Sequence, residues 1–187
     1  MPFDLKKNLV FYGAYHRDPT NVAIHMACVP LLLATAFQFG TNTASLPTPR
    51  LLTRLSLPLN FGTLAATLYS TLYLLLSPNL AGATFTPVIL GSAALANRLC
   101  TSYDRTKVNS IAIGIHIVSW VAQFIGHGKF EGRKPALLDN LVQALFLAPL
   151  FVWYEGLFKL GFYKGLKAEV ELGIKEEIAR IKLGKKE

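Results

Sequence analysis

Residues 22–40 read VAIHMACVPLLLATAFQFG, and no Asp, Glu, Lys or Arg occurs between Asp18 and Arg50. A helix needs about 20 mostly apolar residues to cross a bilayer. The stretch therefore predicts one membrane span. It contains a single histidine, His25, and ionisable groups inside membrane helices are costly and typical of functional sites.

Three further stretches also lack acidic and basic residues, namely those between Arg54 and Arg98, between Lys107 and Lys129, and between Asp139 and Glu155. The stretch between Arg54 and Arg98 predicts two helices, near residues 60–76 and 80–97, and residues 109–126 predict a fourth span. A fifth apolar stretch, 136–158, is interrupted by Pro149. Because proline breaks helical hydrogen bonding, this stretch predicts a broken or re-entrant segment.

The composition agrees with a membrane protein. Of 187 residues, 52% are hydrophobic and 16% are charged, whereas soluble domains carry about 25% charged residues. These values exclude a single water-soluble core, a secreted disulfide scaffold, a coiled coil and a disordered chain. The net charge of +8 indicates membrane orientation rather than nucleic-acid binding. The distribution of Lys and Arg among the loops slightly favours four membrane crossings, with both ends of the chain cytosolic, over five crossings.

The predicted fold is therefore an all-α integral membrane protein with about four transmembrane helices and the broken fifth segment. Two terminal helices are expected to lie in the interface, because each carries an apolar stripe at helical spacing. The stripes are Leu5, Leu9, Tyr12 and His16, and Val170, Ile174, Ile178 and Ile181. We expect a membrane-embedded catalytic domain over residues 1–163 and an amphipathic charged tail over 164–187.

All four histidines lie in or beside the apolar segments. His16 precedes Asp18-Pro19, and Asn21 is expected to cap the first span, which places His25 one turn inside it. After four crossings the chain returns to the same side at His127. These three imidazoles are expected to converge, and histidine is a common metal ligand.

His116 fits this convergence less easily. It precedes His127 by 11 residues, which on one unbroken helix corresponds to about 16 Å. Either the glycines at 126 and 128 break the helix and fold His127 back, or His116 belongs to a second site. The simpler alternative for every buried histidine is a hydrogen bond to a protein acceptor.

The segment 126–135, GHGKFEGRKP, adds polar candidates. Glu131 is expected to bind the metal or to orient an imidazole. Arg133 is expected to hold a substrate carboxylate, because its guanidinium can make bidentate contacts. Asp139 lies in the next apolar segment and needs a partner there. Asn21 is a further candidate for the surroundings of the metal.

The residues around the histidines form two groups of motifs. The first comprises YGAYH at 12–16, Asn21, IH at 24–25 and CVP at 28–30. The second comprises His116, SW at 119–120, QFIGHG at 123–128, EGR at 131–133, PAL at 135–137, DN at 139–140 and QAL at 143–145. These motifs resemble those of the 2-hydroxy fatty acid dioxygenases of phytosphingosine breakdown. The resemblance covers most of residues 8–160.

The resemblance implies an Fe(II)-dependent enzyme of the endoplasmic reticulum membrane. Its expected reaction is α-oxidation, in which a 2-hydroxy fatty acid and O2 give the fatty acid one carbon shorter, within sphingolipid degradation. The histidines matching those of the family, expected to be catalytic and to bind iron, are His16, His25, His116 and His127. Neutral imidazoles suit ferrous iron and leave positions open for substrate and O2.

Three other functions remain possible from the residues themselves. Paired histidines inside a helix bundle can hold haem, as in a membrane electron carrier. Histidine sites also bind zinc, which would favour hydrolysis. A non-enzymatic membrane scaffold or lipid carrier would use its histidines only as hydrogen-bonding groups.

Overall fold

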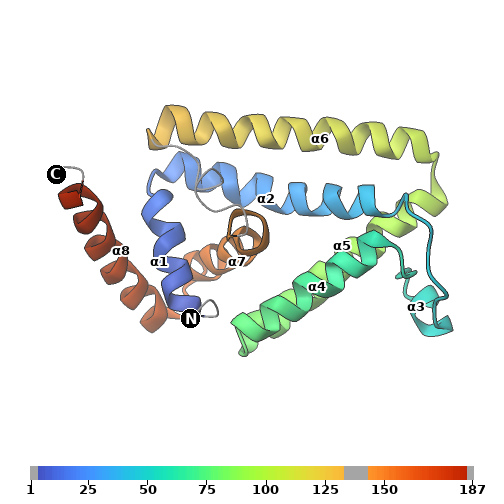
Figure 1. Ribbon diagram of the computed structural model, residues 1–187, viewed down its shortest axis with the longest axis horizontal. Helices are drawn as coiled ribbons and strands as arrows, with labels where there is room; N and C mark the ends of the chain where they lie inside the picture. Colours follow the sequence, from blue (N-terminus) through green and yellow to red (C-terminus); the bar gives the residue numbers. More distant parts are fainter. Residues whose placement is uncertain (1–3, 133–142, 185–187) are drawn as a thin grey trace. The chain divides into compact units, whose positions relative to one another are not determined.

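The structure is a computed structural model that describes residues 4–132 and 143–184. Every element in these ranges is a helix (Figure 1). In chain order they are α1 (Leu5–Tyr15), α2 (Pro19–Gly40), α3 (Arg50–Arg54), α4 (Phe61–Leu76), α5 (Leu80–Ser102), α6 (Arg105–Ile125), η1 (Gly126–Glu131), η3 (Gln143–Leu147), α7 (Ala148–Lys159) and α8 (Lys164–Gly184). The predicted all-helical class is therefore confirmed for the described residues.

Among the described residues, three helices are long and apolar enough to cross a membrane, judged by length and composition. They are α2, α5 and the continuous helix Arg105–Glu131 formed by α6 and η1. The predicted span at 60–76 is the helix α4, which has only 16 residues. At 1.5 Å per residue α4 is about 24 Å long, shorter than the about 30 Å of a hydrocarbon core.

The expected fifth segment, 136–158, is described only from residue 143 onward. The interruption predicted at Pro149 is wrong, because η3 runs directly into α7 and the helix is continuous from Leu145 to Lys159. The bend comes later, between α7 and α8, where the axes differ by 117°. Counted together as one broken span, these two helices would raise the number of candidates to four.

The chain divides into two compact units, residues 1–27 with 122–187 and residues 28–121. In the second unit α4 and α5 lie side by side (Figure 1). Asparagine caps begin both helices, since Asn60 accepts from the Thr63 N–H and Asn79 from the Ala81 N–H. Asn60 also donates to Asn97 of α5 at 2.6 Å, so a buried amide contact holds the two helices together.

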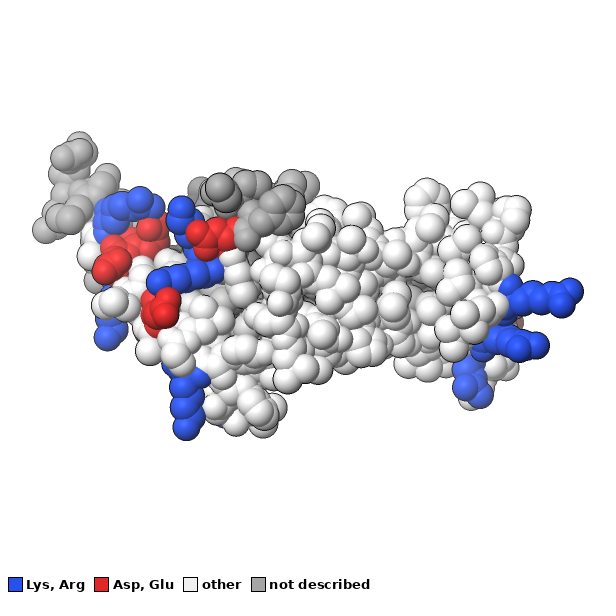
Figure 2. Space-filling model, turned by 90° about the horizontal axis from the view of Figure 1, so that it is seen from below, with Lys and Arg blue, Asp and Glu red and all other residues white. Residues whose placement is uncertain are grey.

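Charged side chains are distributed differently in the two units (Figure 2). The first unit carries basic and acidic groups together over α1 and α8. The second unit carries its charged residues around α3 and the α5–α6 turn, namely Arg50, Arg54, Arg98, Asp104, Arg105 and Lys107. Its long helices between these positions are uncharged, as expected for segments in contact with lipid.

In the first unit, α8 packs along α1 (Figure 1). Two residues of the apolar stripe of α8 are buried there, since Val170 and Ile174 are only 5% and 4% exposed. Lys6 and Glu169 add an ion pair at 2.7 Å. Part of the segment expected to be a tail therefore packs on α1.

The close approach of α1 and α8 predicts a sharp difference between two glycines of α8. A Cβ on Gly173 would lie 2.7 Å from Val10 Cγ2, whereas a Cβ on Gly165 would meet nothing within 4 Å. Gly173→Leu should therefore destabilise the protein by about 1–3 kcal/mol through overpacking, and Gly165→Leu should not. Thermal unfolding of both variants in detergent measures this difference. Equal midpoints for the two would contradict the observed helix pair.

Candidate metal site

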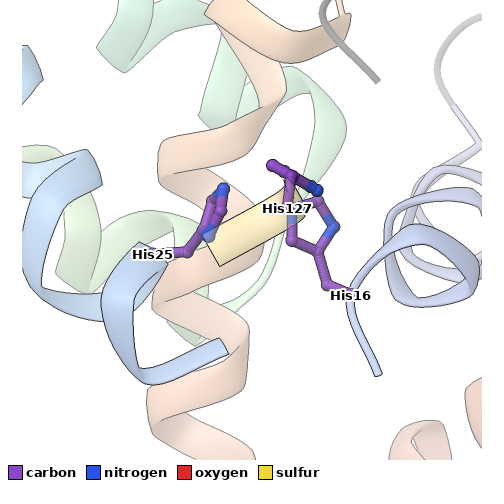
Figure 3. Close-up of side chains that lie close together, drawn as sticks. All are labelled: His16, His25 and His127. Atoms are coloured by element: carbon purple, nitrogen blue, oxygen red, sulfur yellow. The ribbon is translucent and has the colours of Figure 1, made fainter. Parts of the chain in front are cut away.

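Three histidines from separate segments meet in the first unit (Figure 3). His16 follows the end of α1, His25 lies in the second turn of α2, and His127 lies in η1. Their ring centroids are 4.5, 4.8 and 4.8 Å apart, and one ligand atom from each lies within 4.8 Å of the others. All three residues are buried, with at most 8% exposure.

Hydrogen bonds define which ring nitrogens are available. His16 Nδ1 donates to the Tyr12 carbonyl and His25 Nδ1 donates to the Asn21 carbonyl, both at 2.9 Å. A carbonyl only accepts, so Nδ1 carries the proton in each ring and Nε2 keeps its lone pair. Metal-binding histidines commonly use their second nitrogen in this way.

Two of the remaining ring nitrogens lack hydrogen-bond partners. His16 Nε2 and His127 Nδ1 are buried and form no hydrogen bond within the described part of the chain. Buried polar atoms without partners are rare and unfavourable. Because a metal ion binds each imidazole nitrogen at about 2 Å, small ring movements would let one ion satisfy all three. The residues present therefore fit a metal.

Burial keeps the His16 ring in the neutral form that metal binding requires. Burial lowers the pKa of His16 well below its ordinary value, and the neighbouring His25 lowers this pKa further. His16 is therefore neutral at pH 7, and metal binding needs neutral imidazole. The Tyr12 ring stacks on His16 with centroids 4.0 Å apart. Burial raises the pKa of this phenol, so Tyr12 adds no charge.

Glu131 connects the three histidine-bearing segments. Its carboxylate accepts hydrogen bonds from the backbone N–H groups of Arg17 and Asp18, at 2.9–3.0 Å, and from Asn21 Nδ2 at 3.1 Å. The carboxylate lies at the start of α2, where the helix dipole favours an anion. Because these donors occupy it, Glu131 acts as an anchor between η1 and the α1–α2 turn.

Gly126 and Gly132 shape the segment that carries His127. The helix does not break at Gly126 or Gly128; α6 continues into the wider π-helix η1, which ends at Gly132 with φ of +63°. A Cβ on Gly126 would lie 2.5 Å from Asn21 Oδ1, so glycine is needed for this approach to α2. Short π-helical segments of this kind occur frequently at functional sites.

His116 lies in the second unit and is not a member of this group. Its Nδ1 is 2.7 Å from Thr35 Oγ1, and Trp120 Nε1 donates to its Nε2 at 3.1 Å. Because an indole N–H can only donate, Nε2 is the accepting nitrogen and Nδ1 donates to the threonine. Both nitrogens of His116 therefore have protein partners.

The residue that caps the start of α2 differs from the one predicted. Asn21 is not the helix cap, because α2 begins at Pro19. Asp18 takes this role, accepting from the N–H groups of Thr20 and Asn21 at 2.8 and 3.1 Å. An aspartate directly before proline is a typical helix start, so the sequence carried this signal. Arg133 and Asp139 lie outside the described residues.

The fold and site together define an all-helical protein with a buried three-histidine group suited to a metal. The chain belongs to the 2-hydroxy-palmitic acid dioxygenase Mpo1-like family, whose model matches residues 3–160. It is 37% identical over 182 residues to the 2-hydroxy-palmitic acid dioxygenase MPO1 of Saccharomyces cerevisiae, covering 95% of each chain. The family resemblance is thus confirmed. No solved structure matches the chain.

The hydrogen bonds of Glu131 predict that its substitution weakens metal binding. Glu131→Gln replaces one accepting oxygen by an NH2 group that faces N–H donors, so η1 should lose its anchor. We expect metal affinity to fall about 10–100-fold, as for other residues that orient metal ligands. Competition with a chelator measures this affinity, with Glu176→Gln on the exposed face of α8 as the control. Unchanged affinity in Glu131→Gln would contradict the anchoring role.

Proposed function

We propose that the protein is an Fe(II)-dependent dioxygenase that converts a 2-hydroxy fatty acid and O2 to the fatty acid shortened by one carbon. The observation that carries this proposal is the buried triad of His16, His25 and His127, in which His16 Nε2 and His127 Nδ1 have no hydrogen-bond partner among the described residues. Membership of a family named for a 2-hydroxy-palmitic acid dioxygenase supports the same substrate class.

The donor set favours ferrous iron among the possible groups. Three neutral imidazoles leave coordination positions open, as non-haem iron oxygenases require. Bound there, Fe(II) would supply the activation of O2 beside the C1–C2 bond of the substrate. A haem fits poorly, because two axial imidazoles on opposite sides of its iron have ring centres about 6 Å apart, whereas these rings are 4.5–4.8 Å apart.

The residues of this chain have separate roles in the proposal. His16, His25 and His127 hold the metal, and Glu131 and Asn21 fix the segments and the His25 ring. His116 supports the helices through Thr35 and Trp120 instead of binding the metal. The contacts predicted for Arg133 with the substrate carboxylate and for Asp139 with a polar partner remain proposals.

A membrane location suits the substrate. Each buried CH2 contributes about 0.8 kcal/mol to partitioning of a fatty chain into the bilayer, so a long-chain 2-hydroxy acid is concentrated where apolar helices lie. The candidate spans α2, α5 and α6 with η1 are compatible with such a protein. The proposal includes a location in the endoplasmic reticulum membrane and a role in the breakdown of phytosphingosine.

The triad predicts loss of metal and turnover together. His25→Ala and His127→Ala should each remove most bound iron and abolish conversion of 2-hydroxypalmitate to pentadecanoate, because two imidazoles hold the ion much more weakly than three. Metal analysis and product analysis, with and without O2, measure both effects. Product formation without O2, full activity of either variant, or a Soret band in the purified protein would each contradict the proposal.

The hydrogen bonds of His116 predict a different outcome. His116→Ala removes the partner of the Trp120 N–H and should destabilise the protein by about 1–3 kcal/mol, while iron per chain stays at the wild-type level. Metal analysis beside thermal unfolding separates these effects. Iron loss as large as in His25→Ala would instead make His116 a metal ligand.

A further inference from the structure

A cavity of about 270 Å³ lies in the first unit, where α1, α7 and α8 meet the start of α2. Much of its wall is apolar, formed by Leu9, Val22, Phe151, Phe158, Val170 and Ile174. His16 and Tyr12 also line it. One histidine of the triad is therefore also part of the cavity wall.

The cavity carries positive charge without ion-pair partners. Of its three basic residues, Arg17 pairs with Glu171 at 3.1 Å. Lys159 Nζ instead lies 3.1 Å from the thioether sulfur of Met26, a weak and uncharged acceptor. Among residues 4–132 and 143–184, neither Lys159 nor Lys167 forms an ion pair.

We propose that this cavity binds the carboxylate end of the long-chain acid, with Lys159 and Lys167 supplying the positive charge. This inference rests on the proposed function and adds its substrate contacts. The cavity is smaller than the about 300–1,000 Å³ of typical sites for whole small molecules. It therefore suits the polar end and first carbons of the acid, and the rest of the chain extends beyond it.

The reaction requires such a site to lie close to the metal. The bond that is cleaved joins C1, the carboxylate carbon, to C2, so the group that holds the carboxylate must lie beside the triad. His16 meets this requirement because it belongs to both the triad and the cavity wall. The apolar residues of the wall suit the first methylene groups of the chain.

Glu155 makes the charge argument testable in both directions. It lines the same cavity and forms no ion pair with any described residue. A bound carboxylate would be repelled by Glu155 and attracted by the two lysines. Removing the acid should therefore strengthen binding, and removing the lysines should weaken it.

The test is binding of palmitate, which lacks the 2-hydroxyl group, to the full-length protein in detergent, measured by calorimetry. Lys159→Gln with Lys167→Gln should raise the Kd at least about tenfold, as expected for losing charge-assisted hydrogen bonds. Glu155→Gln should lower the Kd several-fold. Lys175→Gln, on the exposed side of α8, is the matched control and should leave it unchanged.

Two further readouts separate charge from packing. Binding of the uncharged hexadecanol should be the same in all these variants. With 2-hydroxypalmitate as substrate, replacing both lysines should lower kcat/KM, while the iron content stays at the wild-type level. An unchanged palmitate Kd in the double variant, or an equal loss of hexadecanol binding, would overturn the proposal.

Arg133→Gln provides the comparison with the other candidate for the carboxylate. If it weakens palmitate binding and the lysine pair does not, the cavity proposal is wrong. Failure of the wild-type protein to convert 2-hydroxypalmitate would instead contradict the dioxygenase function. The palmitate Kd needs no turnover, so it would still decide whether the cavity binds an acid.

Discussion

The carboxylate of Glu131 is the interaction on which the site depends. It accepts from the backbone beside His16 and from Asn21, whose carbonyl holds the His25 ring, and it lies four residues after His127. One anion at a helix start thus joins η1 to the α1–α2 turn and the start of α2, which lie more than 100 residues away in sequence. Besides the ring contact of His16 with His127, the hydrogen bonds to Glu131 are what join η1 to the α1–α2 turn in the described part of the chain.

This anchoring explains how imidazole nitrogens can be buried without protein partners. Leaving His16 Nε2 and His127 Nδ1 unpaired is unfavourable by itself. The cost is tolerated because Glu131 and the Gly126 approach hold the surrounding backbone in place. A metal that binds these nitrogens then stabilises the folded chain, since binding to the native state alone adds to its stability.

The sequence predicted best those features that depend on the composition and spacing of residues close together in the chain. Charge-free stretches predicted α2, α5 and α6, and the convergence of His16, His25 and His127 followed from counting crossings. Three features could not be predicted because they depend on tertiary contacts. The Thr35 partner of His116 comes from α2, Val170 and Ile174 of α8 are buried where this helix packs on α1, and the donors to Glu131 lie more than 100 residues away.

The central claim is that three imidazoles from three segments hold one ferrous ion. X-ray absorption at the iron K-edge of the full-length protein, purified without O2, tests it directly. The account predicts three imidazole nitrogens at about 2.1 Å, with oxygen ligands from water or substrate completing the coordination. Iron without imidazole ligands, or a purified and active protein that contains no iron, would contradict it.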